Sequence, residues 1–346
     1  MSDTLETIPS WDKTAWRQVD ALLEQEGISR DANLDYTCGL FDEDRRLAAT
    51  GSVFKNTLRC FAVDRSRQGE GLLNQIVSHL MNYQAERGLF HLFVYTKVQS
   101  AKFFRDLGFY EVARVEGTLS FLENRPHGFR DYCAGLAKFK REGTSAAIVM
   151  NANPFTLGHL HLVERAAAEN GTVHLFVLSE DASLVPFSVR WKLVTEGTAG
   201  LPNVICHKSG SYIISSATFP SYFLKDRTAV ILGHARLDLR LFGSIAQAMG
   251  ITARYVGEEP ASRVTGLYNQ VMSEELPKAG VRCVVVPRLE RAGAAVSASV
   301  VRRLIHDGRL EQIRCLVPES TWRYFASPEA APVIRAIRES GQVVHY

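Results

Sequence analysis

The sequence of 346 residues contains no uninterrupted apolar stretch of about 18 residues, the length that a membrane-spanning helix needs. Its first residues, MSDTLETIPSWDK, carry acidic side chains and no apolar segment, which predicts that no secretory signal is present. Lys and Arg total 40 and Asp and Glu total 37, a formal net charge of +3. There is no excess of one sign that would coat nucleic acid or an anionic membrane. We therefore expect a cytoplasmic protein that binds neither.

Cysteine is sparse, and the few cysteines form no recognisable framework. No CxxC pair occurs, which disfavours both a zinc site and the disulfide scaffold of small secreted domains. We expect six reduced thiols in a cytoplasmic protein. The six are Cys38, Cys60, Cys133, Cys206, Cys283 and Cys315.

The composition is that of a folded protein with two domains. Hydrophobic residues make up 46% and charged residues 22% of the chain, which excludes disorder over its length. A charged segment that contains glycine, KFKREGTS, lies near residues 138–144 and has the character of a linker. It predicts a first domain over residues 1–140 and a second over 145–346, the second ending in a helical tail.

The hydrophobic spacing differs between the two domains. The first mixes helical and strand-like patterns, whereas the second alternates short apolar strands with helices. That alternation favours an α/β fold whose parallel sheet is covered by helices on both faces, with ligands at the carboxyl ends of the strands. The first domain is predicted to contain helices at 12–26, 71–87 and 101–107 and strands at 58–63 and 89–96. The second is predicted to contain strands at 146–150, 173–178, 204–206, 229–232, 251–256 and 281–286 and helices at 158–169 and 189–198.

A predicted strand runs directly into a helix in the segment IVMNANPFTLGH. A helix N-terminus offers unpaired N–H groups and a positive dipole end, which suit phosphates. Gly158 permits close approach of a ligand to the backbone, Thr156 offers a hydroxyl, and His159 offers a hydrogen bond to a phosphate oxygen. Asn153 and Phe155 lie just before the helix, where Phe155 would pack beside a nucleotide. The alternative is that Thr156 only caps the helix and His159 lies on its surface.

A second motif, VSASVVR, lies far downstream and ends at Arg302. Ser297 and Ser299 precede a predicted helix, where their hydroxyls and backbone N–H groups would face a triphosphate, and Arg302 would clamp its phosphates. Taken alone, the motif also fits an ordinary helix N-cap followed by a solvated arginine. The two motifs together are far more specific than either one.

The pair of motifs resembles the two signatures of the nucleotidylyltransferase superfamily, (His/Thr)-x-Gly-His and Ile-Ser-Ser-Thr-x-x-Arg. More narrowly, a nearly continuous region over residues 145–314 resembles the citrate lyase ligase family. The segments that carry this resemblance are NANPFTLGHLHLVERAA, HLFVLSEDASLVPFSVRWKLVTEGTAGLPNV, GSYIISSATFPSYFLKD, YVGEEPASRVTGLYNQVM and AVSASVVRRLI. The resemblance implies a Rossmann-like nucleotidylyltransferase domain.

The resemblance also implies an activity. Members of this family use ATP and acetate to acetylate the thiol of the prosthetic group on the acyl carrier subunit of citrate lyase, by way of acetyl-adenylate. Mg²⁺ would arrive with the ATP phosphates, without a dedicated metal site. Thr156, His159 and Arg302 would be catalytic, and Asn153, Phe155, Gly158, Ser297 and Ser299 would bind ATP.

Further residues are weaker candidates. Arg190, near a helix start, would reach a phosphate, or else it is a surface arginine. His234 and Asp238 fit the family's pattern at the end of a predicted strand, although His-Ala-Arg-Leu-Asp departs from its usual His-Thr-x-Ile-Asp. Arg263 follows another predicted strand and would bind acetate or a phosphate. Tyr268 and Asn269 would line the same pocket, or else they pack in a helix.

Gly69 and Gly71 of the first domain lie between a strand and a helix, in SRQGEG, where backbone N–H groups would face a pyrophosphate. Downstream, FFRDLGF follows another predicted strand. With these two segments the first domain resembles the GNAT acyltransferases, because FFRDLGF matches the late helix-turn-strand segment of that family. Ser66 departs from the family's usual Gln or Arg, and no general base is evident. We expect either recognition of the CoA-like arm of the carrier's prosthetic group or a structural, carrier-docking role.

Three other functions remain open from the sequence alone. The ligase could serve another acyl carrier, such as that of malonate decarboxylase. The chain could be a cofactor adenylyltransferase that acts on phosphopantetheine or a mononucleotide. It could also be a GNAT acetyltransferase with a nucleotide-sensing second domain.

Overall fold

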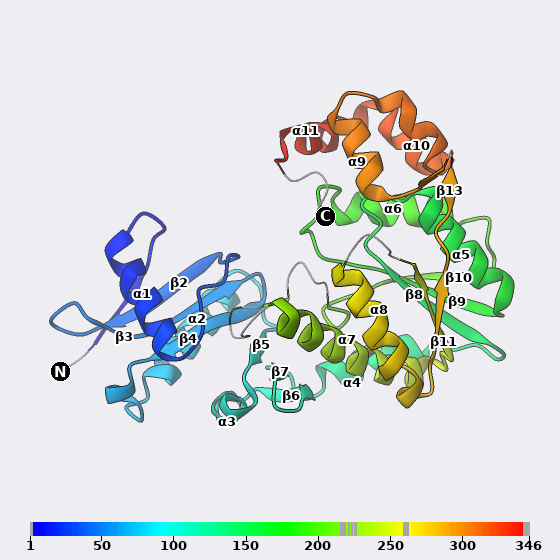
Figure 1. Cartoon of the computed structure of the whole chain (residues 1–346). Coiled ribbons are helices and arrows are strands. Elements are labelled where there is room, and N and C mark those ends of the chain that lie inside the picture. The colour runs from blue at the N-terminus through cyan, green and yellow to red at the C-terminus, as the bar shows by residue number, and fades with distance from the viewer. Residues whose placement is uncertain are drawn as a thin grey trace. The chain divides into compact units, whose positions relative to one another are not determined.

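The computed structural model describes residues 3–214, 219–220, 222, 224, 227–258, 263–291 and 293–341, with only the backbone of 227 and 263–265 (Figure 1). The chain divides into two compact units. Unit 1 comprises Met1–Asp131 and Pro220–Gly233, and unit 2 comprises Tyr132–Phe219 and His234–Tyr346. The chain thus leaves unit 2, contributes one segment to unit 1, and returns. Within the described ranges, no helix has the length and apolar character to cross a membrane.

Unit 1 is built on a seven-stranded sheet of order β1-β2-β3-β4-β5-β7-β6. Neighbouring strands are antiparallel except β4 and β5, which run parallel and pair at Thr57–Phe93 and Leu58–Val94. Beyond these two pairs, β4 and β5 form no further pair among the described residues, so their carboxyl halves diverge. The strands are β1 (Thr4–Thr7), β2 (Tyr36–Phe41), β3 (Leu47–Phe54), β4 (Thr57–Val63), β5 (Phe93–Thr96), β6 (Tyr110–Val115) and β7 (Leu119–Glu123).

Three helices belong to unit 1 near the positions that the sequence predicts. They are α1 (Lys13–Gln25), α2 (Leu72–Glu86) and α3 (Ala101–Asp106). Asp12 caps α1 through the backbone N–H groups of its first turn. α2 begins after Gly71, whose φ of +78° is readily adopted only by glycine. The predicted strand at 58–63 is confirmed, and the one at 89–96 is shorter because β5 begins at Phe93.

Unit 2 contains the expected parallel sheet, with the strand order β10-β9-β8-β11-β12. All of its strand pairs are parallel. From β8 the chain adds β9 and β10 on one side of the sheet, and it then adds β11 and β12 on the other side of β8. The crevice for a ligand lies at such a reversal, outside the carboxyl ends of the strands. The strands are β8 (Ser145–Met150), β9 (Thr172–Val177), β10 (Val204–Lys208), β11 (Ala253–Gly257) and β12 (Arg282–Val286).

Helices connect these strands and continue beyond the last one. α9, α10 and α11 lie together at one end of unit 2 (Figure 1), where Phe325, Val333 and Ile337 join the main core. The remaining helices are α4 (Gly128–Ala137), α5 (Leu157–Glu169), α6 (Phe187–Gly197), α7 (Arg227–Met249), α8 (Arg263–Glu275), α9 (Ala298–His306), α10 (Glu319–Phe325) and α11 (Ala331–Glu339). Short 3-10 turns lie at Arg65–Arg67, Val98–Ser100, Pro277–Ala279, Leu310–Cys315 and Pro328–Ala330, and β13 (Glu290–Arg291) pairs with β14 (Ala294–Ala295).

The strand predicted at 229–232 is wrong, because these residues lie within α7. Four consecutive apolar residues fit a buried strand and a buried helix equally well. The following residues decide between the two. Buried side chains recur at three- and four-residue spacing along the rest of α7, at Ala235, Leu239, Phe242, Ala246 and Met249.

Two buried histidines in unit 2 should make its stability depend on pH. His174 on β9 and His207 on β10 are buried, with 3.0 Å between Nδ1 of the first and Nε2 of the second. Burial lowers the pKa of each ring to about 4, helped by the charge of Arg141 at His174 and by His174 at His207. In the unfolded chain these rings take up protons below about pH 6.5.

Since the folded pKa values are lowered, the stability that the neutral pair provides is complete above about pH 6.5 and is lost as the pH falls toward 4. We expect the free energy of unfolding to drop by about 3 kcal/mol between pH 7.5 and pH 5. Urea denaturation at both pH values measures it. The double substitution His174→Val with His207→Phe should flatten the dependence, and an equal slope in both proteins would refute the assignment.

Candidate active site

The loop after β8 forms a capped helix start that fixes the position of His159. Thr156 is the N-cap of α5, and its hydroxyl oxygen accepts the His159 backbone N–H at 3.3 Å. The Thr156 backbone N–H donates in return to His159 Nδ1 at 3.1 Å. Because Nδ1 is an acceptor, the proton of the neutral ring is on Nε2. The cap therefore leaves His159 with one N–H donor available to a ligand.

The surroundings keep the His159 ring neutral. Burial, together with the positive charges of Arg288 and Arg302, lowers its pKa to about 4. The ring stacks at an interplanar angle of 17° on Phe155, which is fully buried in the core. A neutral ring at neutral pH can donate Nε2–H to an anionic oxygen. Phe155 stacks against that ring. Because Phe155 is fully buried, it also packs in the core, in addition to the expected nucleotide contact.

Gly158 brings the two sequence motifs together. A Cβ atom at this position would lie 2.7 Å from the carbonyl oxygen of Val296, a distance that real Cβ atoms do not show. The first turn of α5 therefore packs directly on the backbone that leads into α9. The close neighbour at Gly158 is thus protein backbone, and this contact requires glycine whether or not a ligand also approaches.

The second motif also forms a helix cap. Ser297 is the N-cap of α9, and its hydroxyl oxygen accepts the Val300 backbone N–H at 3.3 Å. The hydroxyls of Ser297 and Ser299 lie 2.9 Å apart. Two helix N-termini, those of α5 and α9, are therefore adjacent through the Gly158–Val296 contact. Both ends carry partial positive charge, which suits a polyphosphate.

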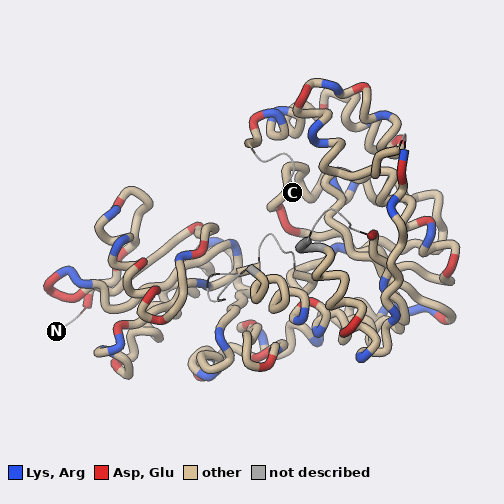
Figure 2. The backbone as a smooth tube through the Cα atoms, viewed as in Figure 1, with Lys and Arg blue, Asp and Glu red and all other residues tan. Residues whose placement is uncertain are grey.

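Arg302 connects the two motifs through a hydrogen bond. It is buried, and its guanidinium donates to the backbone carbonyl of Asn153 in the loop after β8. Burial lowers its pKa to about 10, so it stays protonated at neutral pH. Acidic and basic residues are mixed along the backbone (Figure 2), so the positive character of the site comes from its own arginines. Asn153 itself accepts the Val185 N–H at 3.0 Å, which holds the next loop in place.

Arg190 has a different role from the phosphate contact that the sequence suggests. Its side chain is fully buried on α6. It donates to four backbone carbonyls in the loops that follow β8 and β9, with distances from 2.6 to 3.0 Å. A guanidinium with this many partners and no exposure is not available to a phosphate. Arg190 instead holds together the loops at the carboxyl ends of β8 and β9. Its four acceptors are the carbonyls of Val185, Asn151, Leu178 and Glu180.

Arg288 is a site residue that the sequence reasoning missed. It follows β12, and its Nε donates to the Glu258 carbonyl at 2.8 Å, just after β11. Its charge contributes to the low pKa of His159. One feature of the sequence could have pointed to Arg288: it lies two residues beyond the end of a predicted parallel strand, and ligand-binding loops lie at such ends. A lone arginine in such a loop is too common to single out without the tertiary contact.

Among the weaker candidates, the structure brings His234 and Tyr268 together but not Asn269. His234 lies on α7, where its Nε2 donates to the Ile214 carbonyl at 2.9 Å. Tyr268 lies close to it, with 5.6 Å between ring centroids. Asn269 points elsewhere and donates to the Gly257 carbonyl at 3.3 Å. The side chain of Arg263 lies outside the described residues.

A buried polar cluster surrounds His234 and Tyr268. Asp238 accepts the Tyr268 hydroxyl at 2.5 Å and forms an ion pair with Arg254 at 3.3 Å, with both charged side chains buried. It also accepts the Ile214 N–H at 3.3 Å. Ile214 is thus held through both its N–H and its carbonyl. The sequence reasoning missed Arg254, whose position on β11 gave no sign of an ion pair with α7.

Removing the charge of Asp238 should destabilise unit 2. In Asp238→Asn, the buried guanidinium of Arg254 loses the one anionic partner that it has among the described residues, and a buried charge without compensation costs about 3 kcal/mol. Urea denaturation measures this cost. The exposed pair between Glu275 and Lys278 provides a matched control, because Glu275→Gln should cost less than about 1 kcal/mol. Equal effects of the two substitutions would contradict the assignment.

Comparisons with known proteins agree with this arrangement. Residues 145–325 match the family model described as the citrate lyase ligase C-terminal domain. A citrate (pro-3S)-lyase ligase of Klebsiella pneumoniae is 38% identical over 316 residues, which cover 90% of this chain and 92% of that protein. A protein of the same name from Escherichia coli (strain K12) is 38% identical over 304 residues, 85% of this chain and 86% of that protein.

Solved structures resemble the two units separately and at low identity. A putative nicotinate-nucleotide adenylyltransferase from Vibrio parahaemolyticus covers 57% of this chain and 96% of its own, at 14% identity and a TM-score of 0.32. A putative acyl-CoA N-acyltransferase from Klebsiella pneumoniae covers 35% of this chain and 95% of its own, at 12% identity and a TM-score of 0.31. These scores carry no functional argument.

The fold places the chain in the α/β class, because a unit built on a seven-stranded, mostly antiparallel sheet precedes a unit built on a five-stranded parallel sheet. Within that class, the chain belongs to the citrate lyase ligase family, whose named relatives are enzymes.

Proposed function

We propose that this enzyme uses ATP and acetate to acetylate the thiol of the prosthetic group on the acyl carrier subunit of citrate lyase. One observation supports the proposal above others. The Thr156–His159 turn and the Ser297–Arg302 turn are adjacent at the carboxyl end of β8, through the contact of Gly158 with Val296. This pairing occurs in a chain whose relatives are named citrate (pro-3S)-lyase ligases.

The first step needs positioning and positive charge rather than a protein nucleophile. A carboxylate oxygen of acetate attacks the α-phosphorus of ATP, the bond to the bridging oxygen breaks, and pyrophosphate leaves. Nε2–H of His159 and the guanidinium of Arg302 stabilise the charge that develops on the phosphates. The N-termini of α5 and α9, with Ser297 and Ser299, bind the leaving pyrophosphate. Acetyl-adenylate is the product.

The second step transfers the acetyl group. The thiolate of the carrier's prosthetic group attacks the acetyl carbon, the carbon–oxygen bond to the phosphate breaks, and AMP leaves. A thiol has a pKa near 8.5, so a minor fraction is ionised at neutral pH without a protein base. The net reaction converts acetate, ATP and the carrier thiol into the acetyl thioester, AMP and pyrophosphate.

Mg²⁺ enters this account as part of the MgATP substrate. Mg²⁺ prefers oxygen ligands and is commonly held by nucleotide phosphates. Among the described residues, no group of three or more His, Cys, Asp or Glu side chains could hold a metal ion. The charged side chains that act on His159 are the cations Arg288 and Arg302, which suit phosphates rather than a metal ion.

The identity of the carrier needs a direct test. Purified enzyme is mixed with MgATP, ¹⁴C-acetate and one carrier, either the carrier subunit of citrate lyase or that of malonate decarboxylase. We expect thioester-bound label on the citrate lyase carrier at a rate at least tenfold higher. Label only on the malonate decarboxylase carrier would reassign the partner. Formation of dephospho-CoA and pyrophosphate from ATP and added phosphopantetheine would favour a cofactor adenylyltransferase.

A further inference from the structure

The carboxyl halves of β4 and β5 in unit 1 are not paired with each other, and the space between these two halves is here called the crevice. β4 and β5 are parallel, pair at two positions, and then diverge, so the facing backbone groups from Arg59 onward in β4 and Tyr95 onward in β5 do not pair with each other. Carboxyl ends of parallel strands border ligand crevices in α/β folds. Because both edges of this crevice are backbone, it suits an extended arm that carries amide groups of its own.

A side chain of the same protein occupies this crevice. Tyr222 comes from Pro220–Gly233, the segment that the later part of the chain contributes to unit 1. Its ring is buried, and its hydroxyl donates to the Tyr95 carbonyl of β5 at 3.4 Å. A backbone hydrogen bond from Cys60 of β4 reaches the same phenol. Tyr222 therefore bridges the two diverging strands where an arm would have to lie.

The surrounding residues hold Tyr222 in place. The Tyr222 carbonyl accepts the backbone N–H of Ser29 at 2.9 Å. Ser29 also donates its hydroxyl to the same oxygen at 3.4 Å. Further along the segment, Gly233 lies so close to Leu119 and Leu224 that an added Cβ atom would lie 3.3 and 3.4 Å from them. Tyr222 is thus held by polar contacts, and Gly233 by packing against Leu119 and Leu224.

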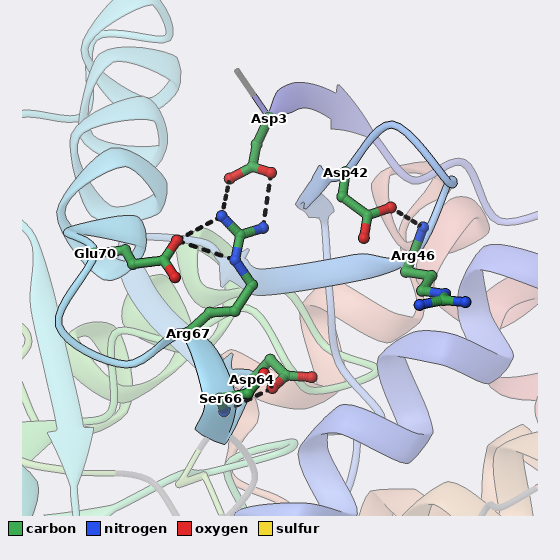
Figure 3. Close-up of polar contacts among 7 residues, drawn as sticks. All are labelled: Asp3, Asp42, Arg46, Asp64, Ser66, Arg67 and Glu70. Atoms are coloured by element: carbon green, nitrogen blue, oxygen red, sulfur yellow. Dashed lines mark hydrogen bonds and ion pairs between the residues drawn. The ribbon is translucent and has the colours of Figure 1, made fainter. Parts of the chain in front are cut away.

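The loop that follows β4 is also engaged by side chains of the same protein. Arg67 lies in the loop that leads from β4 to Gly69, Gly71 and α2. Its guanidinium bonds both carboxylate oxygens of Asp3, at 2.8 and 3.0 Å, and Glu70 at 3.0 Å (Figure 3). Two carboxylates thus neutralise the cation of a loop whose backbone would otherwise suit a pyrophosphate.

We propose that Tyr222 is a plug that occupies the place of a pantetheine-type arm in unit 1, so that such an arm enters only by displacing it. The ligand class is an amide-containing thiol arm, as in CoA. The plug is independent of the ligase reaction, since unit 2 carries the residues proposed for that reaction. It explains how the chain itself fills the crevice of unit 1.

Calorimetric titration of CoA into the full chain tests the plug. Saturating MgATP is present without acetate, so that the nucleotide site of unit 2 is filled. Three proteins are compared: wild type, Tyr222→Gly, which empties the crevice, and Tyr222→Phe, which keeps the ring. Adenosine 3′,5′-bisphosphate, which lacks the arm, is titrated as the matched ligand control. Thermal unfolding checks the fold of each variant.

We expect Tyr222→Gly to lower the Kd for CoA at least tenfold relative to wild type and Tyr222→Phe to leave it within about twofold. The arm-less nucleotide should not distinguish the proteins. Equal CoA binding by wild type and Tyr222→Gly, including no binding by either, overturns the proposal, as does an equal gain for the arm-less control. Micromolar CoA binding by wild type overturns it even if Tyr222→Gly does not fold.

Discussion

Replacing His159 with alanine is expected to lower the rate of acetate-dependent exchange of pyrophosphate into ATP by about 100- to 1,000-fold, the usual cost of removing one donor aimed at developing charge. The capped turn after β8 directs the neutral ring's Nε2–H away from its backbone partner. Burial, helped by the charges of Arg288 and Arg302, lowers the pKa of the ring and keeps it unprotonated. No other described histidine shares this position. The lost donor should lower kcat more than it raises KM for ATP.

The control for this substitution is on the same helix. His161→Ala on α5 removes a second histidine that is absent from the Thr156 cap and should change the exchange rate less than twofold. His159→Ala also removes half of the capping box, which costs about 1 kcal/mol, so thermal unfolding is measured alongside. An exchange rate in His159→Ala within fivefold of wild type, with the fold intact, would exclude His159 from the reaction.

Replacing Gly158 with alanine is expected to lower the exchange rate by about 100-fold. The added methyl would lie 2.7 Å from the Val296 carbonyl oxygen, so α5 and the start of α9 must move apart. Misplacing catalytic groups by about 1 Å can cost 100-fold in rate, whereas the overpacking should cost about 1 to 3 kcal/mol of stability. Activity should therefore fall far more than the fraction of folded protein.

Gly135→Ala is the matched control for Gly158→Ala. Gly135 lies in α4, and an added Cβ there would meet no atom within 4 Å. Alanine at that position should leave activity unchanged and raise stability by up to about 1 kcal/mol through helix propensity. Wild-type activity in folded Gly158→Ala would show that the approach of the two motifs does not matter for the reaction.

Much of the site could be predicted because it is local in sequence. Thr156 and Ser297 are N-caps, and the residue types that cap helices after strands are readable without a structure. The approach of the two turns could not be read, because it depends on Gly158 meeting a backbone carbonyl about 140 residues away in the chain. Arg190 was misassigned for the same reason, since its four carbonyl partners lie on separate loops.

The strand predicted at residues 229–232 was wrong because hydrophobic spacing over so few residues does not distinguish a strand from a helix. Residues 229–232 are uniformly apolar, and only the buried face that continues to Met249 identifies a helix. Because of that error, the sequence analysis placed His234 at the end of a strand. In the structure it lies inside α7, where its side chain donates to the Ile214 carbonyl. Tyr222 could not be placed at all from sequence, because the segment that bears it belongs to unit 1 despite its position late in the chain.

The most direct test of the account is exchange of labelled pyrophosphate into ATP by the purified enzyme with MgATP and acetate, in the absence of any carrier. Formation of acetyl-adenylate is reversible and requires only the site in unit 2, so we predict exchange that depends on acetate. Exchange that ignores acetate but requires an adenylylated product, such as dephospho-CoA or a dinucleotide, would contradict carboxylate activation and assign the site to cofactor adenylylation.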